Sequence, residues 1–207
     1  MRFRPILLML SGVVVASSAC SMDATAPTSQ MAPRADVNAA RGKPGEVFFR
    51  PRPDPFSSAL GVTYTVTINP QVTNVVRFGA HTLTIPGRAI CAAGSGYGSE
   101  YFDQDCRTEK RPVTITALVR ATDDSIPRID FTPQLRFSPR ESVMLQLHVP
   151  NLTPASPIGN ILYCATATTV ACVDEAAVDP ELRTFADYIT HTLFRRIKHF
   201  SGYFVET

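Results

Sequence analysis

Apolar and polar residues alternate with a period of two along several short stretches of this chain. The clearest stretch is 62–68, in which Val62, Tyr64, Val66 and Ile68 alternate with threonines. Because successive side chains of a β-strand point to opposite faces, this alternation predicts a strand that is buried on one face. Similar stretches, separated by glycine and proline turn signals, predict further strands over 47–49, 72–78, 81–85, 113–121, 128–131, 135–137, 142–149, 161–168, 190–194 and 199–205.

One helical candidate interrupts this pattern near the C-terminus, at residues 174–188. Asp179 can cap a helix that opens at Pro180, because proline is well tolerated at the first helical position, and apolar residues recur from there to Tyr188. About nine or ten short strands with turn signals between them are typical of a sandwich. We therefore predict an all-β fold, an antiparallel β-sandwich with one short helix, over residues 56–207.

Residues 1–19 have the composition of an export signal. Arg2 and Arg4 form a basic start, residues 6–16 are mostly apolar, and residues 17–19 are small. The apolar stretch is too short to span a bilayer. We expect this segment to direct export and to be removed.

The residues around the predicted cleavage site, Ala-Ser-Ser-Ala before Cys20, resemble the lipobox of bacterial lipoproteins. In that family the cysteine is lipidated and becomes the new N-terminus. Ser17 departs from the large aliphatic residue that is usual there, which leaves ordinary signal-peptidase cleavage and a free Cys20 thiol as the alternative. We expect a membrane anchor at Cys20, a location in the bacterial cell envelope, and a disordered tether over 20–55, whose Ala, Thr, Ser and Pro show no apolar period. Ser21 favours the outer membrane.

The number of cysteines supports the lipoprotein interpretation, because five is an odd count for an exported protein. Lipidation of Cys20 leaves four, which can pair in three ways. Loop-closure entropy favours two local disulfides, Cys91 with Cys106 and Cys164 with Cys172, each bracketing a loop between predicted strands. A zinc site is disfavoured, since there is no Cys-x-x-Cys and no histidine at ligand spacing from either pair.

Composition and charge exclude some classes of partner. The chain has 207 residues, 44% apolar and 18% charged, with a formal charge of +2. Without Arg2 and Arg4 of the signal segment, 18 basic residues balance 18 acidic ones. This balance disfavours a nucleic-acid partner. We find no cofactor motif and predict no cofactor.

The remaining histidines and the acidic residues of the loop do not indicate a catalytic or metal site. His81, His148 and His191 are scattered, form no pair at ligand or triad spacing, and are expected on strand surfaces or in the core. The acidic residues of 100–105 could bind calcium through oxygen, but calcium loops supply more carboxylates at closer spacing. We therefore predict a solvated acidic loop, no metal site, and no enzyme acting on an external substrate.

The loop between Cys91 and Cys106 also carries three aromatic residues, Tyr97, Tyr101 and Phe102. Exposed aromatic rings on a loop closed by a disulfide are typical of a recognition surface, so we name these three as candidate binding residues for a protein or glycan of the envelope. The alternative is that the rings fold back over the rim of the sandwich as packing.

Four segments share their order and spacing with one known family. They are Gly79-x-x-x-Leu83-x-Ile85-Pro86 followed by Ala89, then Pro127-x-Ile129-x-Phe131-x-Pro133-x-Leu135-x-Phe137-x-Pro139, then Val143-x-Leu145-x-Leu147, and His199-Phe200-Ser201-Gly202-Tyr203. Together they resemble the ZU-five-type domain of zonula-occludens, ankyrin and netrin-receptor proteins, over about residues 60–207. The resemblance implies a β-sandwich, and similar domains occur in exported bacterial proteins.

Some members of that family cut themselves within His-Phe-Ser, which makes His199 and Ser201 candidate catalytic residues here. By resemblance, Ser201 would attack the carbonyl carbon of Phe200 in an N-to-O acyl shift, with His199 as the base, and water would hydrolyse the ester. The alternative is structural, with His199 and Ser201 on one face of a half-buried terminal strand and Phe200 and Phe204 on the other. Since cleavage would free only seven residues, we favour the structural alternative: a lipoprotein whose sandwich is a binding or structural module.

Overall fold

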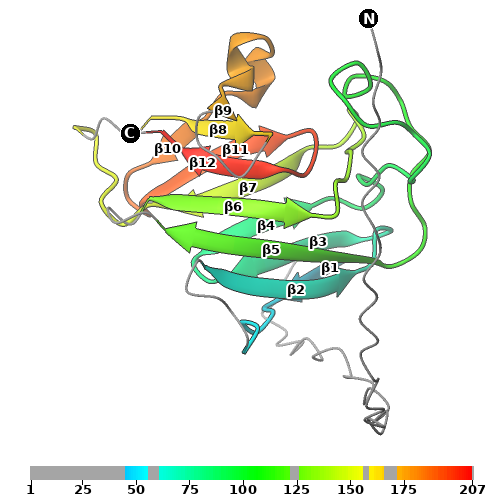
Figure 1. The fold of residues 1–207 in the computed structure, drawn as a ribbon, viewed down its shortest axis with the longest axis horizontal. Helices are drawn as coiled ribbons and strands as arrows, with labels where there is room; N and C mark the ends of the chain where they lie inside the picture. Colours follow the sequence, from blue (N-terminus) through cyan, green and yellow to red (C-terminus); the bar gives the residue numbers. More distant parts are fainter. Residues whose placement is uncertain (1–44, 56–60, 122–125, 156–158, 166–171, 207) are drawn as a thin grey trace, which may run out of the picture. The chain divides into compact units, whose positions relative to one another are not determined.

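The computed structural model describes residues 45–55, 61–121, 126–155, 159–165 and 172–206, and these residues form two packed β-sheets (Figure 1). Contacts divide the chain into residues 1–32 and 33–207, and every described residue lies in the second unit. The predicted signal segment, Cys20 and most of the predicted tether lie outside the described residues.

The first sheet has six strands in the order β1-β3-β4-β7-β11-β10. Its neighbours pair antiparallel, except that β1 runs parallel to β3. The edge strand expected at 47–49 is therefore present, within the predicted tether. The strands are β1 (Glu46–Phe49), β3 (Thr73–Phe78), β4 (His81–Ile85), β7 (Val143–His148), β10 (Phe185–Asp187) and β11 (Thr192–Ile197).

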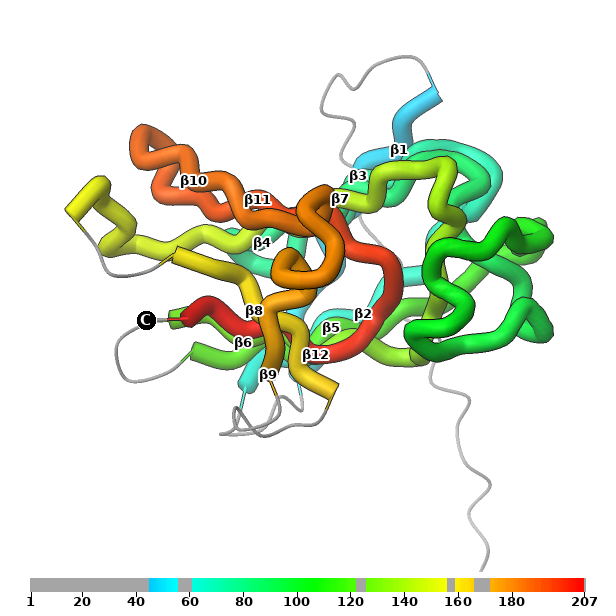
Figure 2. Tube along the Cα trace, turned by 90° about the horizontal axis from the view of Figure 1, so that it is seen from above, coloured from blue at the N-terminus to red at the C-terminus, as the bar shows by residue number. Residues whose placement is uncertain are grey.

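The second sheet also has six strands, in the order β2-β5-β6-β12-β8-β9, and all its pairs are antiparallel. Figure 2 shows the two sheets as separate layers. This arrangement confirms the predicted all-β sandwich. The strands are β2 (Val62–Ile68), β5 (Val113–Ala121), β6 (Pro127–Thr132), β8 (Ile161–Cys164), β9 (Cys172–Val173) and β12 (Gly202–Val205).

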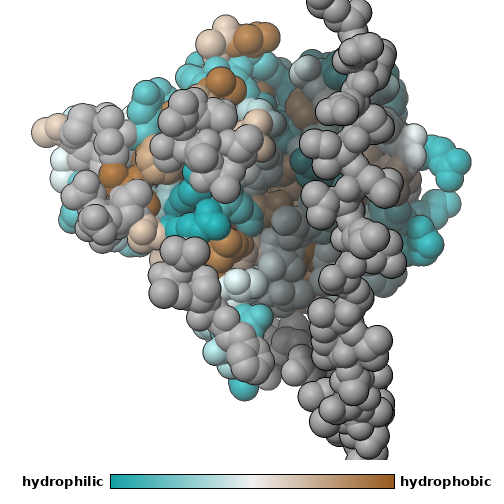
Figure 3. Space-filling view, viewed as in Figure 1, coloured by the Kyte–Doolittle hydropathy of each residue, from teal (hydrophilic) through white to brown (hydrophobic). Residues whose placement is uncertain are grey.

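The core lies between the sheets and is built from the inward positions of the alternating strands. On β2 the inward Tyr64 and Ile68 are buried, whereas the outward Thr65 and Thr67 are exposed. Burial of such apolar side chains is the main favourable term in folding. The outer face of the second sheet, toward the viewer in Figure 3, carries hydrophilic and hydrophobic patches side by side.

The segment predicted as a helix has a different structure. Two 3-10 turns, η2 (Glu175–Ala177) and η3 (Pro180–Leu182), take its first part, and the side chain of Asp179 caps the second by accepting from Glu181 N at 3.0 Å. The remainder forms β10, which pairs with β11. The predicted cap at Asp179 is thus confirmed, but pairing with a neighbouring strand satisfies the backbone groups that a longer helix would have satisfied.

Both predicted disulfides are confirmed. Cys91 bonds to Cys106 and closes the loop that carries Tyr97, Tyr101 and Phe102. Cys164 bonds to Cys172 and joins β8 to β9. Two disulfides indicate an oxidising, extracytoplasmic compartment. Within the described ranges, no helix has the length and apolar character needed to cross a membrane.

Candidate functional site

The His-Phe-Ser motif lies where the chain crosses from one sheet to the other. β11 ends at Ile197 in the first sheet and β12 begins at Gly202 in the second, so 198–201 forms the crossover (Figure 2). His199 and Phe200 have no exposed surface, and Ser201 is 9% exposed. The motif therefore precedes the terminal strand, and its side chains do not alternate between a buried and an exposed face.

Strand β6 and the segment that follows it hold the backbone of this crossover. Phe200 N donates to Leu135 O at 2.7 Å, and Ser201 O accepts from Phe131 N at 2.9 Å. His199 forms an isolated bridge with Arg136. The segment predicted as a strand at 135–137 is thus used to tie down the crossover. Because its backbone groups are paired, the crossover can be buried.

Aromatic rings enclose the imidazole of His199. The Phe102 ring stacks on it with centroids 4.2 Å apart, and the Tyr163 ring meets it edge-on at 4.6 Å. The Tyr97 ring lies edge-on at 6.0 Å. We call these residues, together with Glu175, the His199 cluster: Tyr97, Phe102, Tyr163, Glu175 and His199.

Glu175 supplies the charge that balances this buried site. One of its carboxylate oxygens lies 2.9 Å from His199 Nε2, and the other accepts from Arg195 Nη2 at 2.8 Å. Arg195 is fully buried and also donates to Ile161 O. A buried guanidinium needs such a partner, because an unpaired charge in the interior is strongly destabilising. Glu175 therefore connects η2 to both β11 and the crossover.

Two tyrosine hydroxyls bond to the backbone of the motif. Tyr97 donates to Phe200 O at 2.7 Å, and its oxygen lies 3.4 Å from His199 Nδ1. Tyr203 donates to His199 O at 2.6 Å. Burial raises the pKa of both tyrosines above the ordinary value of 10.0. Both phenols are thus neutral at neutral pH and act as hydrogen-bond donors.

The serine of the motif has a different partner from the histidine. Ser201 Oγ donates to Cys164 O at 3.0 Å, in the neighbouring strand β8. The imidazole of His199 is bonded to Glu175 and lies beside the Tyr97 hydroxyl. The structure thus brings the serine hydroxyl next to β8 and the imidazole next to η2. For self-cleavage, Ser201 Oγ would have to leave Cys164 O and find a base.

The three aromatic residues of the closed loop all have partners in the fold. Tyr97 and Phe102 lie on His199, and the Tyr101 ring lies over Gly96, where a Cβ would come within 2.8 Å of it. Buried Arg136 donates to the backbone oxygen of Tyr101. All three rings are half-buried. The rings thus pack on the domain with one part of their surface exposed, and their role in binding stays a prediction.

Two acidic residues of the same loop are paired with cationic side chains of the protein. Asp103 pairs with Lys198, and Asp105 pairs with Arg140. Among the residues that the structure describes, no group of three or more His, Cys, Asp or Glu side chains is placed to hold a metal ion. The loop carboxylates therefore fasten the loop to the crossover and to the segment after β6.

Sequence reasoning missed Glu175, Tyr163, Arg136 and Arg195. A signal existed for Arg195, because it occupies an inward position between Leu193 and Ile197 on a strand with clear alternation. A charge at an inward position indicates a buried ion pair.

No known protein family, curated protein or solved structure matches this chain. The resemblance to the ZU-five-type domain stays a prediction from the sequence.

Proposed function

We propose that this chain is an exported bacterial lipoprotein that holds a disulfide-bonded β-sandwich at the cell envelope, where the domain acts as a binding or structural module. The observation that carries the proposal is the pair of disulfides, which place the domain in an oxidising compartment. They also use all four domain cysteines and leave Cys20, after the predicted signal segment, outside both disulfides. The proposal assigns the lipid to Cys20.

The state of the buried polar groups supports a module over an enzyme. Glu175 bonds to both His199 and Arg195, and Arg195 also donates to the backbone oxygen of Ile161. Catalytic groups generally need an open face toward a substrate, whereas His199 is fully enclosed. The cluster thus stabilises the crossover. The partner under this proposal is the membrane, through the lipid, and a protein or glycan of the envelope.

Metabolic labelling tests the anchor directly. The full chain is expressed in a bacterium supplied with labelled palmitate, and the membrane fraction is extracted with detergent. Label and membrane retention are expected for the wild type and for the matched Ser21→Ala variant, and both should be lost in Cys20→Ala. An unlabelled wild-type protein in the soluble fraction would overturn the lipoprotein proposal.

A second candidate, self-cleavage between Phe200 and Ser201, is favoured by one observation. The Tyr97 hydroxyl already donates to Phe200 O, the atom that would carry negative charge during attack. In this reaction Ser201 Oγ bonds to the Phe200 carbonyl carbon, the C–N bond breaks, and the proton of the hydroxyl passes to the departing amine. Water then hydrolyses the ester to a carboxylate and the free hydroxyl.

Intact mass distinguishes the two candidates. β12 lies between β6 and β8 and pairs with both, so the protein must be denatured before a cut peptide can leave. Under the module proposal we expect one full-length species that gains four hydrogens on reduction, two for each disulfide. Self-cleavage would be established instead if the wild type loses residues 201–207 and the Ser201→Ala variant keeps them.

A further inference from the structure

The second sheet opens where β5 and β6 part. The β5 ladder with β2 runs from Val62↔Val119 to Ile68↔Val113. The ladder with β6 begins at Ala121↔Pro127 and stops at Thr116↔Thr132. The first three residues of β5, 113–115, therefore have a ladder partner in β2 and none in β6.

The backbone of Thr114 faces this opening. Phe131 N donates to Ser201 O, so the polar groups of Phe131 point toward β12. Since backbone groups alternate sides along a strand, those of Thr132 point toward β5 and its partner Thr116. Thr114 lies two residues from Thr116 and points the same way. Its N–H and C=O are thus directed to the position that a continued β6 would occupy.

The chain after Thr132 cannot fill this position. β6 ends at Thr132, and Pro133, which follows at once, interrupts the regular strand. Beyond it, Arg136 bridges to His199 and Phe137 bridges to Ile90. This segment is therefore committed to the crossover and to the loop that follows β4.

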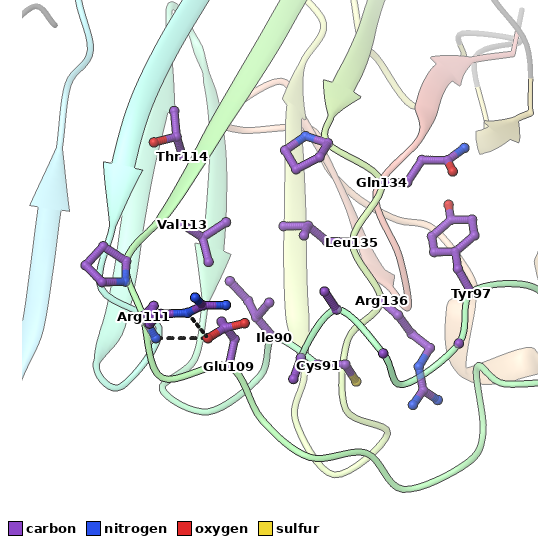
Figure 4. A pocket seen from close by; sticks show the side chains of 16 residues that line it. Ile90, Cys91, Tyr97, Glu109, Arg111, Val113, Thr114, Gln134, Leu135 and Arg136 are labelled. Carbon is purple, nitrogen blue, oxygen red and sulfur yellow. Dashed lines mark hydrogen bonds and ion pairs between the residues drawn. The ribbon is translucent and has the colours of Figure 1, made fainter.

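A cleft of about 880 Å³ occupies the opening (Figure 4). This volume lies in the range of sites that hold small ligands. Ile90, Val113 and Leu135 form an aliphatic middle, with Gln134 and Tyr97 toward one end and the Glu109–Arg111 pair toward the other. The site is thus apolar at its centre and polar at its ends.

We propose that this cleft binds an extended peptide segment, which adds to the free edge of β5 by pairing with the backbone of Thr114. An apolar side chain of the peptide lies against Ile90, Val113 and Leu135. This inference rests on the binding role proposed above and names its site and partner class. Strand addition of this kind gains affinity from main-chain hydrogen bonds and selectivity from side-chain pockets.

Two features favour a peptide over a glycan. A main-chain donor and acceptor on one residue match the spacing of a peptide backbone. Sugars, in contrast, are commonly held by stacking on aromatic rings, and the cleft has one such ring, Tyr97, whose hydroxyl is already bonded to Phe200 O. The aliphatic centre suits a β-branched or leucine side chain.

The test is a titration followed by NMR, with the full exported Cys20→Ala chain, its disulfides intact. The probes are the blocked peptides acetyl-Thr-Val-Thr-Val-Thr-amide and its variant with a central leucine. We expect saturable shifts of the Thr114 amide and of the methyl groups of Ile90, Val113 and Leu135. Peptides N-methylated at every residue should bind roughly tenfold more weakly or not at all, because neither of their edges can donate to β5.

A matched pair of variants checks the location. Ala93 is exposed and lines the cleft, whereas Ala186 is exposed on β10 of the other sheet. Ala93→Trp should abolish the shifts, and Ala186→Trp should leave them unchanged. Absence of saturable shifts with every peptide, or shifts that survive Ala93→Trp, would overturn the proposal.

A glycan probe and the anchor test separate the remaining outcomes. Saturable shifts of the same residues with chitotetraose but not with the peptides would make the cleft a glycan site and reject the peptide proposal. Failure of palmitate labelling does not affect the Thr114 shifts, so the two proposals fail in distinguishable ways.

Discussion

The hydroxyl of Tyr97 donates a hydrogen bond of 2.7 Å to the carbonyl oxygen of Phe200. The two residues come from the disulfide-closed loop and from the crossover between sheets, 103 positions apart in the chain. The bond fastens the loop over the His-Phe-Ser motif. Since Phe200 is fully buried, its carbonyl has little access to water as an alternative partner.

The first prediction is that Tyr97→Phe destabilises the protein by about 1–3 kcal/mol, the usual cost of leaving a buried acceptor without its donor. Chemical denaturation measures the change in the free energy of unfolding. The control is Tyr188→Phe, because Tyr188 is 43% exposed and should change stability by less than about 0.5 kcal/mol. Equal effects of the two substitutions would show that the Tyr97 hydroxyl has no stabilising role.

The strands could be predicted from the sequence because each signal is local. The alternation of Val66 and Ile68 with threonines identifies β2 without knowledge of its partner. The disulfides were also predictable, since the paired cysteines are 15 and 8 positions apart and loop closure favours near partners.

The His199 cluster could not be predicted in this way. Its contacts join residues 24 and 102 positions apart, from Glu175 to His199 and from Tyr97 to His199. They form only because the crossover turns the motif away from a strand and into the space between η2 and the closed loop. No alternation or spacing in the sequence indicates these long-range contacts. The predicted helix failed for a related reason, because pairing of β10 with β11 outweighed local helical signals.

The two disulfides are expected to contribute differently. Replacing Cys91 and Cys106 by serine should lower the free energy of unfolding by about 3 kcal/mol, and replacing Cys164 and Cys172 by somewhat less, because the closed segments span 15 and 8 positions. Urea denaturation checks the order.

Loss of the disulfide between Cys91 and Cys106 should also speed hydrogen exchange of the Phe200 amide, since the loop that this disulfide closes covers the crossover. Unchanged exchange would contradict this covering role.

Gly202 is expected to be required for space. A Cβ there would lie 2.5 Å from Asp130 Oδ1 and 3.1 Å from Cys164 O. Gly202→Ala should therefore displace Asp130 from its ion pair with Arg128 and destabilise the protein by about 1–3 kcal/mol. Gly94→Ala, with nothing within 4 Å of the added atom, is the control and should be close to neutral. A neutral Gly202→Ala would show that the ion pair moves freely.

The free energy of unfolding should decrease as the pH falls, because His81 is buried in its neutral form. Burial, with a smaller effect from His148, lowers the pKa of His81 from 6.5 to about 4. Between these values the unfolded chain binds a proton that the folded chain does not, so the contribution is present above about pH 6.5 and is lost as the pH falls toward 4. The loss reaches about 3 kcal/mol at most.

Denaturation curves at pH 7 and pH 4.5 measure this dependence, and His81→Gln isolates it. Carboxylates whose pKa is lowered in the fold, such as Asp179, add a decline of the same sign at lower pH. The difference between wild type and variant is therefore the quantity to compare. The wild type should lose more stability than the variant between the two values, and parallel curves would exclude His81 as the cause.

Glu175 should be the most sensitive position of the His199 cluster, because its carboxylate serves two buried partners. Glu175→Gln keeps the shape of the side chain and removes the charge that balances Arg195, which is expected to cost about 3–5 kcal/mol. Asp174→Asn is the matched control. Asp174 lies farther from Arg195, at 3.5 Å, and asparagine retains the cap on Ala176 N, so we expect a loss below about 1 kcal/mol. Thermal and urea unfolding of both variants measure the difference. Equal losses would assign the stabilisation to the whole acidic turn, whereas a selective loss in Glu175→Gln would locate it at the contact between η2 and the crossover.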